Sequence, residues 1–197
     1  MDRLHRLAVT ISRVGALIGG GLLLLSAFVV CIDVILRTFF SRSLGGSDEL
    51  SGYALAIATA WGLSFALLER AHIRVASVYE HVSLRVRAGL DLISLAGFFA
   101  FMLLTAQYAW TSLAQSMTSN ARSLSAISTP LAIPQAVWFA GFVFLLLVIA
   151  LLLVQSGLAL MRGDLKGVVR LIGAKGVDEE LDEEKAVRGT PASGASI

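Results

Sequence analysis

The chain has 197 residues, of which 56% are hydrophobic and only 15% are charged. A soluble domain carries about 25% charged residues, so this composition leaves too few polar side chains to cover a globule in water. The mean hydropathy of +0.79 agrees. The single cysteine, Cys31, excludes a disulfide framework and any multi-cysteine metal site within the chain. The formal net charge is +2, and we expect the lipid bilayer, and no nucleic acid, as a partner.

Four stretches are apolar and long enough to cross a hydrocarbon core of about 30 Å, which takes roughly 20 residues of helix. Their expected bounds are about 14–36, 48–68, 89–115 and 135–161. A spanning segment has to satisfy its own backbone hydrogen bonds, and these stretches lack the alternation of barrel strands. The predicted fold class is therefore an all-α integral membrane protein with four transmembrane helices, formed by residues 1–162.

The basic residues are distributed unequally among the segments that flank these helices. Three of the sixteen, Arg37, Arg42 and Arg122, lie between helices one and two or between helices three and four. The other thirteen lie near the two termini and in the connection 69–91. Cytoplasmic segments carry the excess of Lys and Arg, so both termini and this connection are predicted to be cytoplasmic.

Two of these cytoplasmic segments have an amphipathic pattern. The connection between helices two and three is predicted to contain a short helix in the membrane interface. Its apolar face would be formed by Val75, Val78, Tyr79, Val82 and Val86. The alternative is a lead-in to helix three whose arginines reach the interface. The tail, residues 163–197, is expected to begin as a basic amphipathic segment on the anionic inner leaflet and to end disordered.

Acidic residues near the outer ends of helices one and two are the main candidates for a functional role. Asp33 and Arg37 lie four residues apart on one helical face, so they can form an ion pair. The alternative interpretation of Asp33 is an ion or proton site. Asp48 and Glu49 open helix two, where negative charge suits the positive end of the helix dipole.

Groups for catalysis or cofactor binding are not apparent. The histidines His5, His72 and His81 all fall in predicted cytoplasmic segments, so a haem held between facing transmembrane helices is not expected. No phosphate-binding glycine loop and no G-x-S-x-G nucleophile motif is present. The four-residue spacing of Gly15 and Gly19 instead indicates close helix packing. We therefore expect no enzyme activity and no cofactor in this chain.

Several short motifs resemble those of one known family. They are Asp33-Val-Ile-Leu-Arg37 closing helix one, Ser47-Asp-Glu-Leu50 opening helix two, Glu69-Arg-Ala-His72-Ile-Arg74-Val75 after helix two, and Pro130-Leu-Ala-Ile-Pro134 before helix four. The order and spacing of these motifs extend over roughly residues 10–160. Over this range the chain resembles the small, DctQ-like subunit of tripartite ATP-independent periplasmic (TRAP) transporters.

The resemblance implies two protein partners. A large multi-helix membrane subunit would carry the sodium and substrate sites, and a periplasmic binding protein would deliver the solute, often an organic acid. The small subunit would be a non-catalytic scaffold in the bacterial inner membrane, bracing the large subunit of a solute:sodium symporter. The residues expected to make structural or partner contacts are Asp33, Arg37, Asp48, Glu49, His72 and Arg74.

Two other functions remain open on the residues alone. A membrane-anchor subunit of a redox enzyme complex would be marked by facing histidines in the membrane, which the four stretches lack. A self-contained small homo-oligomeric transporter commonly places a charged residue within a helix. Glu49 is the only candidate for that role, and it lies at a helix end.

Overall fold

The computed structural model of the chain describes residues 2–70 and 83–173. Within these ranges the fold is all-helical and has no β-strand. The helices are α1 (Asp2–Phe40), α2 (Ser47–Leu68), α4 (Leu84–Thr118), α5 (Ala132–Met161) and α6 (Leu165–Ile172). The helices α1, α2, α4 and α5 are long and apolar enough to cross a membrane. The prediction of an all-α protein with four candidate membrane-spanning helices is thereby confirmed.

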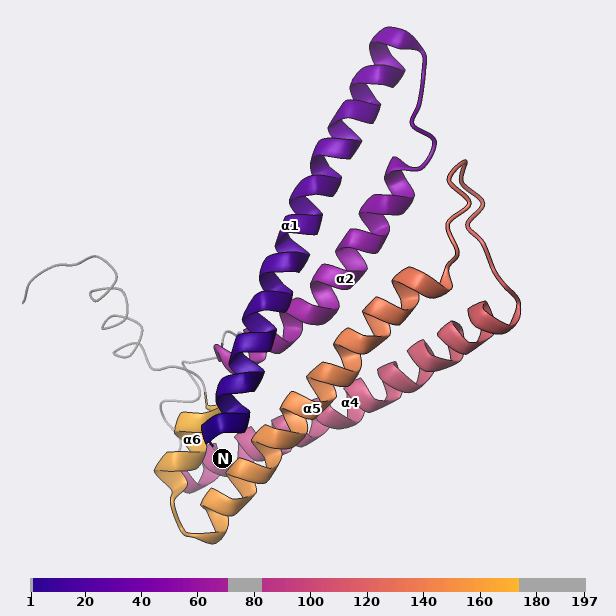
Figure 1. Ribbon diagram of the computed structural model, residues 1–197. Coiled ribbons are helices and arrows are strands. Elements are labelled where there is room, and N and C mark those ends of the chain that lie inside the picture. Colours follow the sequence, from indigo (N-terminus) through magenta and orange to yellow (C-terminus); the bar gives the residue numbers. More distant parts are fainter. Residues whose placement is uncertain (1, 71–82, 174–197) are drawn as a thin grey trace, which may run out of the picture.

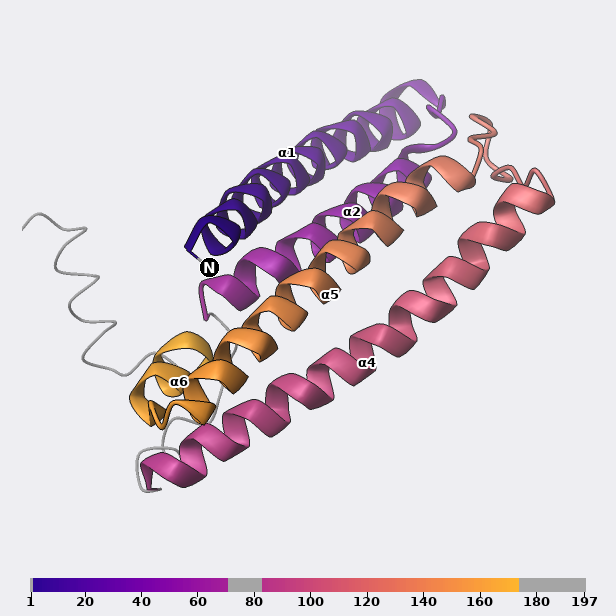
Figure 2. The same cartoon turned by 60° about the horizontal axis from the view of Figure 1, so that its bottom comes forward.

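The four long helices lie side by side in a row, in the order α1, α2, α5, α4 (Figures 1 and 2). Helix α1 packs against α2, α2 against α5, and α5 against α4. The loops 41–46 and 119–131 meet at one end of this row, which we call the loop end. The N-terminus and α6 lie at the other end, which we call the α6 end (Figure 1).

Helices α1 and α4 are longer than the apolar stretches that predict them. At about 1.5 Å per residue the 39 residues of α1 extend over roughly 58 Å, well beyond a hydrocarbon core. Of the predicted interfacial helix, residues 75–82 lie outside the described residues. Val86, which was expected to belong to it, is in the first turn of α4.

The buried apolar core lies mainly between α4, α5 and α6. Its members are Ala8, Ala60, Ala88, Leu95, Met102, Ala106, Ala109, Phe142, Leu145, Val148, Ile149, Leu152, Val168 and Ile172. Helix α1 contributes little to it: 6% of its most apolar 18-residue window is buried, against 33% for α5. Large side chains along α1, such as Leu24, Phe28 and Ile32, are exposed. A bilayer or another protein has to cover them.

Small residues allow α1 and α2 to approach closely. A Cβ atom added to Gly19 would lie 2.8 Å from the Cα atom of Ala58, and one added to Gly15 would lie 2.7 Å from Cε3 of Trp61. Neither distance leaves room for a methyl group. The glycine pair that the sequence suggests for helix packing therefore faces α2.

Trp61 of α2 connects the neighbouring helices on both sides. Its ring lies against Gly15 of α1 and against Gly141 of α5. Its Nε1 donates a hydrogen bond to the backbone carbonyl of Val137, at 3.1 Å, and its ring stacks on Phe144 with centroids 5.7 Å apart. A Trp N–H placed among apolar helices needs such an acceptor.

The short helix α6 folds back onto the ends of α4 and α5. Gly163 makes the reversal with a φ of +74°, and Asp164 caps the helix by accepting the Gly167 N–H at 2.8 Å. Val168 and Ile172 enter the protein core. The segment predicted to be basic and amphipathic is thus helical here, with buried apolar residues, while residues 174–197 lie outside the described ranges.

Candidate functional site

Asp33 organises the loop between α1 and α2. One carboxylate oxygen accepts the Ser43 hydroxyl at 3.1 Å and the Leu44 backbone N–H at 2.6 Å. The other accepts the Ser47 hydroxyl at 2.7 Å and pairs with Arg37 at 2.7 Å. The Asp33 side chain is 2% exposed. Burial of a carboxylate is costly unless its oxygens are paired, and here both oxygens are.

Arg37 lies on the solvent side of the same cluster. Its side chain is 51% exposed, and its Nε donates to Ser43 at 3.2 Å. A longer contact of 3.7 Å joins it to Asp48, whose side chain is 85% exposed. Arg37 therefore covers the buried carboxylate and links the end of α1 to the start of α2.

Glu49 connects α2 to the second loop. Tyr53, one turn further along α2, donates its hydroxyl to Glu49 at 2.7 Å. Ser123, 74 residues away in the loop 119–131, donates its hydroxyl to the other carboxylate oxygen. The Glu49 side chain therefore joins the helical hairpin α1–α2 to the hairpin α4–α5.

The two loops also touch through their backbones. The Ala126 N–H donates to the Gly45 carbonyl at 3.1 Å. Gly45 has a φ of +75°, and a Cβ atom on Gly46 would lie 2.2 Å from Cδ1 of Ile127. A side chain at position 45 would strain the backbone, and a side chain at position 46 would force Ile127 to move.

Asp33, Arg37, Asp48 and Glu49, together with the hydroxyl groups that donate to them, form what we call the loop-end cluster. Its contacts connect the two loops to the ends of α1 and α2. Both oxygens of Asp33 and of Glu49 accept hydrogen bonds from the chain, so an ion or a substrate at either carboxylate would compete with these donors. Among the described residues, no group of three or more His, Cys, Asp or Glu side chains could hold a metal ion.

The structure brings together four of the six predicted site residues: Asp33, Arg37, Asp48 and Glu49 lie at the loop end. His72 and Arg74 lie outside the described residues. Sequence reasoning did not find the hydroxyl donors Ser43, Ser47, Tyr53 and Ser123. The four-residue step from Glu49 to Tyr53 could have suggested one of them, but no local pattern links Glu49 to Ser123.

Comparison with known proteins identifies the family. The family model described as "Tripartite ATP-independent periplasmic transporters, DctQ component" matches residues 26–157. The chain belongs to this DctQ family. The match runs from within α1 to within α5 and includes the whole loop-end cluster. The DctQ chain is therefore a small component of a TRAP transporter and a multi-pass membrane protein. No curated protein and no solved structure matches it significantly.

Proposed function

We propose that this DctQ chain is the non-catalytic small permease subunit of a solute:sodium symporter. It braces the large membrane subunit, which binds sodium and takes up an organic acid or similar solute from a periplasmic binding protein. The observation that carries the proposal is the contrast between two surfaces. The carboxylates of Asp33 and Glu49 are occupied by internal hydrogen bonds, whereas the apolar surface of α1 is open along its length.

The distribution of charge along the helices supports a scaffold over a transport pathway. Helix α1 has no charged residue between Arg13 and Asp33, and α5 has none between Ala132 and Met161. Charged groups at membrane depth usually mark ion or proton routes. With none in the middle of these helices, sodium coupling is better placed in the large subunit.

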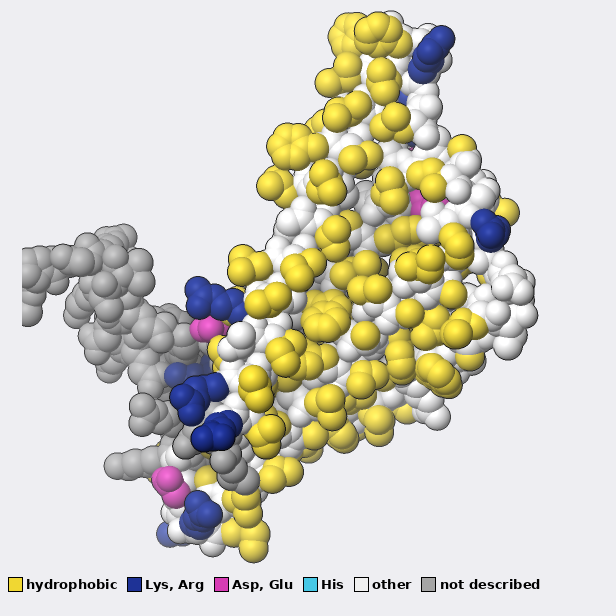
Figure 3. Space-filling model, viewed as in Figure 1, with side chains coloured by type: hydrophobic (Ala, Val, Ile, Leu, Met, Phe, Trp, Pro, Cys, Tyr) yellow, Lys and Arg dark blue, Asp and Glu magenta, His cyan; other side chains and the backbone are white. Residues whose placement is uncertain are grey.

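We further propose that the chain lies in the bacterial inner membrane with the α6 end in the cytoplasm. Lys and Arg side chains gather at that end, while the middle of the molecule is covered by hydrophobic side chains (Figure 3). Arg3, Arg6 and Arg162 are among them, in agreement with the positive-inside rule. Reporter domains fused after residue 197 and inserted in the loop 119–131 test this. We expect the reporter after residue 197 to be active in the cytoplasm and the reporter in the loop 119–131 to be active in the periplasm. The reverse pattern would overturn the proposed orientation.

Reconstitution into lipid vesicles tests the transport role. The chain alone, the large subunit alone, and both together are compared with the binding protein and labelled organic acids present. We expect sodium-dependent uptake only when both membrane subunits are present. Uptake by vesicles that contain this chain alone would refute the scaffold role and favour a self-contained transporter.

Family membership favours the transporter component over a redox-enzyme anchor. The anchor interpretation has a separate test, because haem bands in the visible spectrum of the purified chain would revive it. The interpretation as a homo-oligomeric transporter depends on Glu49 as the charged residue within a helix. That carboxylate accepts hydrogen bonds from Tyr53 and Ser123. An ion carried by Glu49 would first have to displace both hydroxyls.

A further inference from the structure

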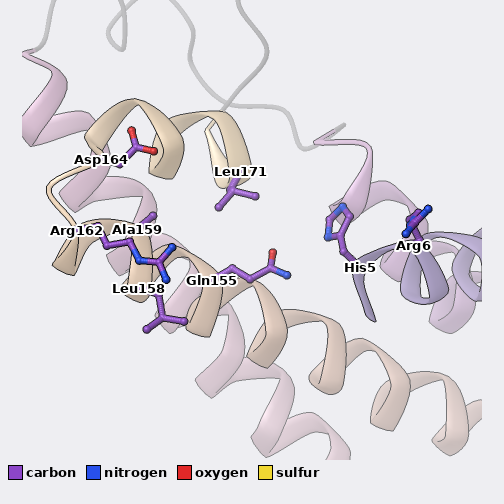
Figure 4. A pocket seen from close by; sticks show the side chains of 8 residues that line it. All are labelled: His5, Arg6, Gln155, Leu158, Ala159, Arg162, Asp164 and Leu171. Atoms are coloured by element: carbon purple, nitrogen blue, oxygen red, sulfur yellow. The ribbon is translucent and has the colours of Figure 1, made fainter. Parts of the chain in front are cut away.

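A cavity of about 380 Å³ lies at the α6 end, where α1, α5 and α6 meet (Figure 4). Helix α1 contributes His5 and Arg6 to its lining, α5 contributes Gln155, and Arg162 follows directly after the end of α5. This cavity is far from the loop-end cluster. All of its lining residues except Gln155 lie outside the stretch 26–157 that matches the DctQ family.

The polar groups of the cavity favour an anionic ligand that accepts hydrogen bonds. The Arg162 guanidinium has no hydrogen bond or ion pair in the part of the chain that the structure describes. Figure 4 shows Gln155 extending its amide from α5 toward His5 of α1. The Nδ1 atom of His5 is buried and has no hydrogen-bond partner among the described residues.

One acidic residue, Asp164, also belongs to the lining. Asp164 accepts the Gly167 N–H at 2.8 Å as the cap of α6, so one of its carboxylate oxygens is already engaged. Two arginines, Arg6 and Arg162, line the cavity as well; Arg6 already takes part in another interaction, so Arg162 is the main cationic group for an anion.

The surroundings of the cavity are apolar. Leu158 and Leu171 line it, and Leu160 and Met161 at the end of α5 are exposed. A free phosphate ion would use only the polar part of this surface. A lipid would place its phosphate on the polar groups and its acyl chains along the apolar helix surface.

We propose that this cavity binds the phosphate headgroup of an anionic phospholipid from the cytoplasmic leaflet. Basic pockets between helices on the cytoplasmic side have the chemistry to bind such headgroups. The leaflet assignment rests on the proposed orientation of the chain. The bound lipid joins the start of α1 to α5 and α6, and so fixes a helix that otherwise packs mainly on α2.

Native mass spectrometry of the full chain in mild detergent tests the proposal by titration with phosphatidylglycerol. Phosphatidylcholine and inorganic phosphate serve as separate probes. Arg162→Gln should weaken phosphatidylglycerol binding about fivefold, the fold-change expected for one arginine near an anionic lipid, and Arg162→Lys should largely retain it. The matched control is Arg13→Gln, which removes an exposed α1 arginine outside the lining and should leave binding unchanged.

Several outcomes would overturn the site. They are equal binding by the Arg162→Gln variant and the original chain, equal binding of phosphatidylcholine and phosphatidylglycerol, and binding of inorganic phosphate as tight as that of the lipid. The titration uses the purified chain in detergent, so its result does not depend on transport or orientation. A failure here is thereby distinguishable from a failure of the proposed function.

Discussion

Asp33 accepts hydrogen bonds from two serine hydroxyls and one backbone N–H in addition to its ion pair with Arg37. The sequence predicts the pairing because four residues separate the two on a helix. It does not predict Ser47 or the Leu44 N–H, since those contacts depend on the path of the loop 41–46. The Asp33 carboxylate therefore accepts hydrogen bonds from several groups, and Arg37 is one of its partners.

The two partners of this ion pair should differ in importance. Asp33→Asn replaces one accepting oxygen with an NH₂ group among donors in a buried site, and we expect a loss of about 2 kcal/mol in the free energy of unfolding. Arg37→Gln changes a half-exposed side chain and should cost less than about 1 kcal/mol. Melting temperatures of the purified variants in detergent measure the difference. Equal losses for the two variants would contradict this view of Asp33.

Exchange of the two charges should not restore stability. In a chain with Asp33→Arg and Arg37→Asp the ion pair can re-form, but the buried Ser47 hydroxyl then has no acceptor at position 33. An unpaired buried donor costs about 1–3 kcal/mol. We expect the double variant to melt well below the original chain, and full recovery would show that the pair alone fixes the loop.

Glu49 and Ser123 should be energetically coupled across the two hairpins. We expect a coupling of about 1–2 kcal/mol in a double-mutant cycle with Glu49→Ala and Ser123→Ala, because each variant removes the same hydrogen bond. Asp48→Ala is the matched control, since its side chain is 85% exposed. Additive effects of the two alanine variants would mean that the bond contributes nothing to stability.

At the scale of elements, hydropathy predicts where the helices cross the membrane better than where they end. Helix α1 begins at Asp2 and α4 at Leu84, both outside the predicted apolar stretches. Residues such as Arg and Leu have a high helix propensity in water, so a helix can continue beyond the membrane. The small-residue spacing in α1 indicates close packing. Which glycine meets which neighbour follows from the rotation of α1 about its axis, and the spacing alone does not fix that rotation.

Two adjacent glycines of α1 give a matched test of the α1–α2 contact. Gly19 lies against the backbone of Ala58, whereas Gly20 has no atom within 4 Å of an added Cβ. Gly19→Leu should separate the helices and cost about 1–3 kcal/mol, as overpacking does, and Gly20→Leu should be close to neutral for the isolated chain. Thermal unfolding in detergent distinguishes them, and a reversed order of stability would place α1 in a different rotation.

At the scale of the whole molecule, the row of four helices leaves apolar surface open on α1, far from the core between α4, α5 and α6. Composition predicts a membrane protein, but it does not predict a row instead of a closed bundle. That arrangement depends on specific contacts between segments distant in sequence. Trp61 with Val137 and Glu49 with Ser123 are two of them.

We propose that this DctQ chain is a scaffold that works in complex with a large membrane subunit. Co-expression of the two chains, extraction in mild detergent and native mass determination test it most directly. We expect one stable heteromeric complex that survives purification through a tag on this chain alone. Recovery of this chain only as a monomer or as homo-oligomers, with the large subunit absent, would contradict it.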